Sequence, residues 1–285
     1  MRLAGTGGTV LILVVATTVH TSGQLLHSRG QNVAPVYEGW EENSDGTVDM
    51  LFGYFNRNLD EVIDVPIGPD NTFGADAADR GQPTKFFPRR NFYVFRVKVP
   101  AEFGNKELVW TIASHGKTER AYGTLKPDYV LNAQVRMLTV GFFGRLGAYA
   151  ANKPPTLRIE GDARRTVVIG EPLRLVAYAA DDGIPRPKPA GPLPTLADAR
   201  GLRVAWFVYR GAGEVTFEPK QFKVYPDYRS DSPWTPGWKA PAIPDGGRYP
   251  VAVTFASTGT FVLRAMAHDG GLATTQDLTV TVLPR

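Results

Sequence analysis

Three aspartates at two turns are the residues of this chain that come nearest to a reactive or ligand-binding group. Asp181 and Asp182 stand in the string DDG, and Asp269 stands in HDGG at residues 268–271. If both turns lie at the same end of the fold, their oxygens could hold Ca²⁺, which takes about six to eight oxygen ligands. The alternative is ordinary β-turns, in which Asp accepts a backbone hydrogen bond and Gly adopts a positive φ. We expect ordinary turns and no cofactor, with calcium as the alternative.

The other titratable residues do not form a catalytic pattern. No G-x-S-x-G string marks a nucleophile, and the histidines are scattered singly as His20, His27, His115 and His268. The paired carboxylates Glu41-Glu42 and Asp60-Glu61 fall at the ends of expected strands, which favours solvated turns over a glycosidase dyad. The chain has no cysteine, so disulfides, thiolate metal sites and a Cys nucleophile are excluded. We therefore expect a protein that is not an enzyme.

The charge balance argues against a nucleic-acid partner. The chain has 32 basic and 28 acidic residues, which gives a formal net charge of +4, and like charges do not gather in runs. The densest basic point is the string FFPRR at 86–90, and one Arg pair is too little for a phosphate-binding face. We expect protein partners instead, with a glycan as an alternative.

Aromatic residues between prolines and glycines are the candidates for partner contact. The insertion at residues 218–250 contains Tyr225, Tyr228, Trp234 and Trp238, and the apolar segment before the second domain contains Phe142 and Phe143. Exposed Trp and Tyr on a Pro-rich loop suit a protein contact or a sugar-stacking platform. The alternative is that the tryptophans fold back and cover the domain. We predict these six residues as partner-binding residues.

The elements that must position these residues are short β-strands. Apolar and polar residues alternate at 48–55, 61–67, 91–99, 107–113 and 117–125, and again in seven stretches between 157 and 283. We expect an all-β protein of two Ig-like β-sandwiches in tandem, at residues 36–131 and 154–285. The second sandwich has insertions at 183–201 and 218–250. An apolar linker without a Ser or Asp helix start occupies residues 132–153. It is either an ordinary linker packed on one sandwich, which we favour, or an exposed apolar strip that meets a partner or a membrane surface.

The N-terminal residues 1–30 have the order of an export signal. Arg2 precedes the apolar run 10–16, and polar residues follow it. The segment is either a cleaved signal peptide or an uncleaved membrane anchor. We expect an exported protein, in the periplasm or on the outer face of the membrane.

The second domain resembles the PKD and cadherin-like immunoglobulin-type modules of bacterial surface proteins. The resemblance rests on PPTLRI from Pro154, on LRLVAYAADDG from Leu173, on Trp206 as the central core tryptophan, and on TGTFVLRAMAHDGG from Thr258. The two insertions depart from the compact pattern of these modules. Residues 36–130 resemble a segment of exported bacterial proteins without a known activity, through EGW, FGYFNRN, VPIGPDN and RGQPTKFFPRR.

These observations predict a non-enzymatic, extracytoplasmic scaffold or interaction protein. One setting is a membrane-extrinsic accessory subunit that stabilises a multi-subunit membrane complex, for example a photosynthetic reaction-centre or antenna assembly. The alternatives are a cell-surface carbohydrate-binding module and an accessory domain of a secreted hydrolase.

Overall fold

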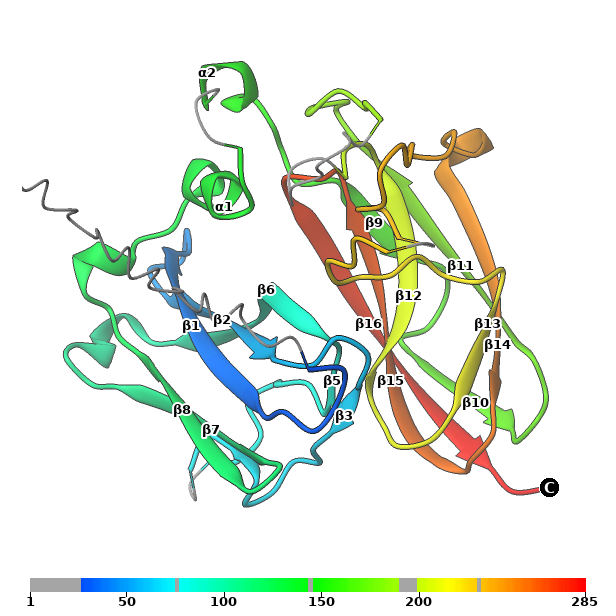
Figure 1. Ribbon diagram of the computed structural model, residues 1–285, viewed down its shortest axis with the longest axis horizontal. Helices are drawn as coiled ribbons and strands as arrows, with labels where there is room; N and C mark the ends of the chain where they lie inside the picture. Colours follow the sequence, from blue (N-terminus) through cyan, green and yellow to red (C-terminus); the bar gives the residue numbers. More distant parts are fainter. Residues whose placement is uncertain (1–26, 75–76, 143–145, 190–198, 230–231) are drawn as a thin grey trace, which may run out of the picture.

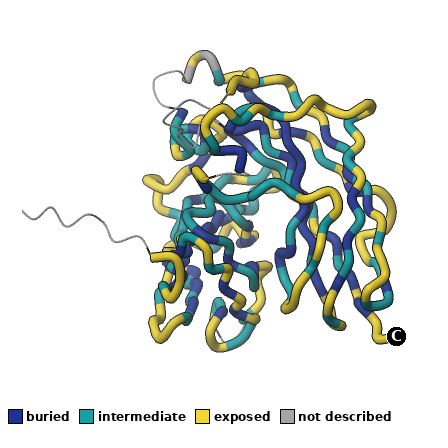
Figure 2. Tube along the Cα trace, turned by 45° about the vertical axis from the view of Figure 1, so that its right-hand side comes forward, coloured by how far each residue is buried: buried dark blue, intermediate teal, exposed yellow. Residues whose placement is uncertain are grey.

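The computed structural model describes residues 27–74, 77–142, 146–189, 199–229 and 232–285. Most of the expected signal or anchor at residues 1–30 lies outside these ranges. Within them, no helix is both long and apolar enough to cross a membrane. Two β-sandwiches lie side by side, with helices α1 (Ala133–Thr139) and α2 (Leu146–Tyr149) at one end (Figure 1). Buried residues run along the strands, and exposed residues gather at the turns (Figure 2).

The first sandwich has sheets of strand order β1-β2-β6 and β4-β7-β8, with a further pair β3-β5. Its core surrounds Trp110, which is fully buried and donates from Nε1 to Asn71 Oδ1 at 2.9 Å. The strands are β1 (Val33–Glu42), β2 (Val48–Asn56), β3 (Ile63–Asp64), β4 (Asn71–Thr72), β5 (Lys85–Phe86), β6 (Arg89–Val99), β7 (Leu108–Ser114) and β8 (Lys117–Gly123), and 3-10 turns lie at η1 (Ala101–Phe103) and η2 (Pro127–Tyr129).

The second sandwich has the strand order of an immunoglobulin domain. One sheet is β9-β11-β14-β13, and the other is β10-β16-β15-β12, with β10 parallel to β16. In immunoglobulin lettering these are A-B-E-D and A′-G-F-C. The strands are β9 (Thr156–Ile159), β10 (Arg164–Val168), β11 (Leu173–Ala180), β12 (Arg203–Arg210), β13 (Val215–Glu218), β14 (Arg248–Phe255), β15 (Gly259–His268) and β16 (Ala273–Leu283), and η4 (Asp245–Gly247) precedes β14. The predicted all-β class of tandem Ig-like sandwiches is confirmed.

A wide bulge interrupts strand β6. Phe52 of β2 pairs with Phe95 and Tyr54 pairs with Asn91, so three residues of β6 oppose the single Gly53. Tyr93 sits at the centre of the bulge with a φ of 52°. Residues 92–94 leave the ladder and bend the strand, as bulges do. They line the cavity between the two sandwiches, which is described below.

The linker at 132–153, predicted without a Ser or Asp helix start, contains helix α1, which begins at an Asn. The side chain of Asn132 accepts a hydrogen bond from the Val135 amide at 2.9 Å and so caps α1. Asn is as effective an N-cap as Ser or Asp, so a helix can begin here although neither of those residues is present. Met137 and Phe142 are buried and pack against Leu272 of the second sandwich. The segment is therefore a packed connection between the sandwiches.

Strand β12 is buried on both of its faces. Val204, Trp206 and Val208 face the core of the second sandwich, which confirms Trp206 as a core tryptophan. Tyr209, on the opposite face, is 3% exposed and belongs to the core of the first sandwich, and Phe207 packs against that core. A strand that is apolar on both faces requires cover on both sides. The first sandwich provides that cover.

The first sandwich also covers the open edge of β12. The Thr84 amide donates to the Tyr209 carbonyl at 3.2 Å, and the Tyr209 hydroxyl donates to the Gly81 carbonyl at 2.6 Å. Arg210 pairs with Asp79 at 2.7 Å, and this partner lowers the pKa of the Asp79 carboxyl. Unpaired sheet edges invite association with other chains, so covering the edge removes that hazard.

Candidate functional site: a cavity between the two sandwiches

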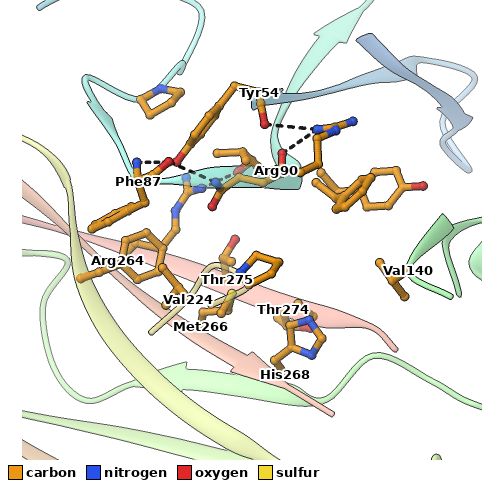
Figure 3. A pocket seen from close by; sticks show the side chains of 18 of the residues that line it. Tyr54, Phe87, Arg90, Val140, Val224, Arg264, Met266, His268, Thr274 and Thr275 are labelled. Atoms are coloured by element: carbon orange, nitrogen blue, oxygen red, sulfur yellow. Dashed lines mark hydrogen bonds between the residues drawn. The ribbon is translucent and has the colours of Figure 1, made fainter. Parts of the chain in front are cut away.

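At the junction of the two sandwiches lies a cavity of about 430 Å³ that is partly open to solvent. Its walls come from the β6 bulge, from α1, from β12, β15 and β16, and from the 218–250 insertion. Figure 3 shows Arg90 on one side of this space and Met266, His268, Thr274 and Thr275 on the other, with Val140 of the linker at its margin. A volume of this size accommodates a small organic molecule.

Much of the cavity wall is aromatic. Phe87 packs edge-to-face against Phe207 at 5.6 Å and lies parallel to the Tyr225 ring at 5.9 Å. The aromatic lining residues are Tyr54, Phe87, Phe92, Tyr93, Phe207, Tyr209 and Trp234. Such a wall favours a ligand with an apolar or aromatic body.

Cationic side chains line the same wall. They are Lys85, Arg90, Arg96, Arg136 and Arg264, and no Asp or Glu is among the described lining residues. The Arg90 guanidinium lies 4.1 Å from the centre of the Phe92 ring, and that of Arg136 lies 5.0 Å from the centre of the Tyr93 ring. The cavity surface is therefore aromatic and positively charged at once.

The carboxylates that balance these cations lie outside the lining. Glu38 accepts from Arg90 Nη2 at 2.8 Å and from the Tyr93 amide at 3.4 Å, so it holds the bulge from behind. Its side chain is only 5% exposed. Burial raises the pKa of the Glu38 carboxyl, and the charge of Arg90 opposes that rise. The Glu38–Arg90 pair is therefore a structural support of the cavity wall.

Arg264 joins the two sandwiches at the cavity. Its Nε and Nη2 donate to the two oxygens of Asp277 at 2.6 and 2.9 Å, and its Nη1 donates to the Val94 carbonyl at 2.5 Å. The guanidinium lies 3.4 Å from the centre of the Tyr209 ring. Since Val94 belongs to the β6 bulge, this buried arginine fixes the bulge against the second sandwich.

His268 lies in the wall opposite Arg90. Its Nδ1 accepts a hydrogen bond from the Gly270 amide at 2.8 Å. Burial lowers the pKa of His268 well below its usual value, and the charges of Arg203 and Arg136 lower it further. The ring is therefore neutral with its proton on Nε2, because Nδ1 is an acceptor. His268 offers one hydrogen-bond donor to this region.

The predicted partner-binding residues differ in how far they are exposed. Tyr228 is 41% exposed, whereas Trp234 is 6% and Phe142 is 2% exposed. The expectation of exposed contact residues is wrong for Trp234 and Phe142. Tyr225 and Trp238 are half-buried, and Phe143 lies outside the described residues.

A buried arginine explains why the two tryptophans fold back. The Arg203 guanidinium lies 5.4 Å from the Trp234 ring and 5.8 Å from the Trp238 ring. Burial lowers the pKa of Arg203 to about 10, while the carboxyl of Asp269 opposes the shift. Arg203 Nη1 donates to the Ala199 carbonyl at 2.6 Å, and the two indole faces add a cation–π contact to this buried guanidinium. The insertion is therefore a cover for this cation over the outer face of β12.

In the two predicted turns, the aspartate side chains accept hydrogen bonds from backbone amides of the same turn. Asp181 accepts from the Gly183 amide at 2.9 Å, and Asp182 accepts from the Ile184 amide at 2.8 Å. Asp269 is fully buried and accepts from the amides of Gly271 and Leu272 at 2.5 and 2.7 Å. In the described part of the chain, no three His, Asp or Glu side chains are grouped so as to hold a metal ion.

The buried carboxyl of Asp269 is expected to make stability depend on pH. Burial raises its pKa to about 7, and the neighbouring charge of Asp181 adds to that rise. The folded state therefore holds a proton that the unfolded state releases near pH 4, and the associated stability is lost as the pH rises toward 7. Relative to Asp269→Asn, the wild type should lose up to about 1.4 kcal/mol per pH unit in this window.

Urea unfolding at several pH values measures this difference. His268 is present in both proteins, so its opposite pH dependence cancels. Asp162→Asn, at a carboxylate whose side chain is 96% exposed, is the matched control. A wild-type minus Asp269→Asn difference that stays constant from pH 4 to 7 would contradict the assignment.

Comparisons with known proteins find similar solved structures but no relative by sequence. No family model and no curated protein matches the sequence. Among solved structures, the chain is similar to a conjugative transposon lipoprotein from Bacteroides eggerthii, with 10% identity over 45% of this chain and 96% of that one, and a TM-score of 0.27. It is also similar to the titin Ig tandem domains A164-A165, with 10% identity over 90% and 100% of the two chains and a TM-score of 0.24.

A third similar structure is the Yersinia pseudotuberculosis adhesin InvE, with 12% identity over 91% of this chain and 61% of that one, and a TM-score of 0.24. The likeness is one of fold. Because these TM-scores are low, the immunoglobulin-type assignment of the second sandwich rests on its sheet order. The narrower resemblance to PKD and cadherin-like modules stays a prediction.

Proposed function

We propose that this chain is a non-enzymatic, extracytoplasmic binding protein whose ligand occupies the cavity between its sandwiches. The observation that carries the proposal is the cavity wall, which combines an aromatic surface with a few converging polar groups. The described lining contains one histidine and no carboxylate, so it lacks the acid–base pair that hydrolysis of a glycoside or ester uses. Export is proposed from the order of charged, apolar and polar residues at the N-terminus.

Binding of a neutral aromatic probe tests the proposal. N-phenyl-1-naphthylamine fluoresces on entering apolar surroundings, and we expect it to bind the purified protein at one saturable site. Thr275→Trp should weaken binding, because Thr275 lines the cavity and an indole there would occupy part of it. Thr281→Trp is the matched control, since Thr281 is an exposed residue farther along the same strand and does not line the cavity.

The results separate binding in the cavity from binding elsewhere. Equal binding by Thr275→Trp and Thr281→Trp would place the probe outside the cavity and contradict the proposal. Absence of any saturable binding to the wild type would contradict it as well. Circular dichroism of each variant confirms that the fold is retained.

A scaffold role in a membrane complex is the second candidate function. Its supports are the rigid joining of the two sandwiches and the exposed apolar side chains of Tyr228 and Ile243, at 41% and 55%, on the insertion. Recovery of the chain together with membrane proteins after detergent extraction would favour this role. The carbohydrate-binding alternative loses support, because burial of Trp234 leaves no pair of exposed tryptophans on which a sugar could stack.

A further inference from the structure

Arg136 is the cation of the cavity whose charge is least compensated. Its one carboxylate contact is Glu41, at 3.5 Å from Nη1, and Glu41 lies closer to Arg96, at 2.6 Å. The side chain of Arg136 is only 12% exposed. Its Nε is buried without a hydrogen-bond partner among the described residues. A guanidinium that is desolvated and weakly paired in this way gains from a nearby anion.

The surroundings hold Arg136 in a fixed position. The Tyr93 ring lies beneath its guanidinium at 5.0 Å, and the Tyr93 hydroxyl donates to Thr139 Oγ1 at 3.0 Å. The Thr139 hydroxyl in turn donates to the Val135 carbonyl of α1 at 3.0 Å. These contacts tie helix α1 to the β6 bulge. A cation fixed in place loses little entropy when it binds a ligand.

The carboxylate that contacts Arg136, that of Glu41, is not among the described residues that line the cavity. His268 feels the charge of Arg136, which helps to lower its pKa, and its neutral ring carries the donor on Nε2. No carboxylate is among the described lining residues. An anionic group that enters from the cavity therefore meets the Arg136 cation and a neutral donor. The like charge of Glu41, 3.5 Å from Arg136, is already paired with Arg96 at 2.6 Å.

We propose that the cavity binds a small organic anion with an aromatic body, whose anionic group pairs with Arg136 and whose rings lie against the aromatic wall. This proposal rests on the proposed function and specifies its ligand class. The ring-bearing part contacts Phe87, Phe92 and Phe207, while the anionic group lies between α1 and the end of β15. Carboxylates and sulfonates share the required chemistry, because both present two anionic oxygens that can accept parallel hydrogen bonds from a guanidinium.

A matched pair of probes tests the charge preference. 1-Anilinonaphthalene-8-sulfonate and N-phenyl-1-naphthylamine share one ring skeleton and differ by the sulfonate. We expect the sulfonate to bind the wild-type protein at least about tenfold more tightly than the neutral probe at low salt, since a charge-assisted contact adds to the same ring contacts. Competition between the two probes shows whether they share one site.

Arg136→Gln tests the assigned residue. The change removes the charge, and Glu41 keeps its pair with Arg96, so no carboxylate is left unpaired. Affinity for the sulfonate should fall about tenfold, while affinity for the neutral probe should stay within about twofold. Arg136→Lys should retain most of the sulfonate binding. Arg174→Gln is the control, because it removes the same charge from an exposed position on β11.

Each outcome decides between the two proposals. Equal affinity of the wild type for both probes would overturn the anion preference and leave the proposed function standing. Parallel loss of both probes in Arg136→Gln, with the fold retained, would overturn the pairing with Arg136. Absence of binding by either probe would overturn the proposed function itself.

Discussion

Gly53→Ala is expected to lower the free energy of unfolding by about 3 kcal/mol, the upper part of the range for overpacking a rigid site. A Cβ on Gly53 would overlap Glu38 Oε1 and the Asn91 carbonyl oxygen, and it would lie 2.9 Å from Arg90 Nη1. These atoms belong to the buried pair and the strand that form the β6 bulge. The added methyl group can be accommodated only by displacing that pair. Urea unfolding at equilibrium measures the loss.

A second glycine supplies the control for this prediction. A Cβ on Gly147, in α2, would meet no atom within 4 Å, so Gly147→Ala should leave stability unchanged or raise it slightly. Adding Glu38→Ala to Gly53→Ala should not restore stability, because the Asn91 carbonyl still occupies the space and Arg90 loses its buried partner. Wild-type stability of the double variant, or equal free energies of unfolding for Gly53→Ala and Gly147→Ala, would contradict the prediction. Either result would mean that the β6 bulge can shift to admit a Cβ at Gly53.

The strands could be predicted from sequence because their signals are local. Alternation located β2 and β6, and the string SHG located the β7–β8 hairpin, in which His115 and Gly116 have φ values of 46° and 71°. A two-residue turn with both φ values positive matches the twist of the strands that it joins. Strand β13 was missed because Val215–Glu218 has only four residues and a proline follows it directly.

The cavity could not be predicted in the same way, because it depends on contacts that are distant in the chain. The bulge is defined by the register of β6 against β2 and by Glu38 behind it. One signal was nevertheless present in the sequence. Strand β12 carries Phe207 and Tyr209 opposite its core residues, and an apolar strand on both faces implies a second layer. Arg264, within the apolar run of β15, was a second signal of this kind.

The aromatic insertion shows the limit of composition as evidence. Clustered Trp and Tyr among prolines are compatible with an exposed contact surface and with a cover over the fold. Arg203, some thirty residues earlier in the chain, decides between them, because its buried guanidinium needs the indole faces. A hydrophobicity pattern does not reveal that a charged residue is buried, so the sequence alone left both interpretations open.

Arg264→Ala is expected to weaken the junction of the two sandwiches and to lower the free energy of unfolding by about 2 to 3 kcal/mol. The change removes both bonds to Asp277 and the bond to the Val94 carbonyl, and it removes the cation from the Tyr209 ring. Asp277 is 41% exposed, so water can solvate it once Arg264 is gone. The main loss is therefore the connection between β15 and the β6 bulge.

Loss of that connection should also change how the protein unfolds. Calorimetry is expected to show one transition for the wild type and two for Arg264→Ala, because the two cores are then coupled mainly through β12. Arg158→Ala provides the control, since Arg158 also stacks on a tyrosine, Tyr178 at 4.5 Å, but at an exposed position on β9. A similar small loss of unfolding free energy in both variants, with one transition retained, would contradict the prediction. The junction would then be held by Tyr209, with little contribution from Arg264. A split transition for Arg264→Ala alone would identify this one guanidinium as the link that couples the sandwiches and keeps the cavity between them in shape.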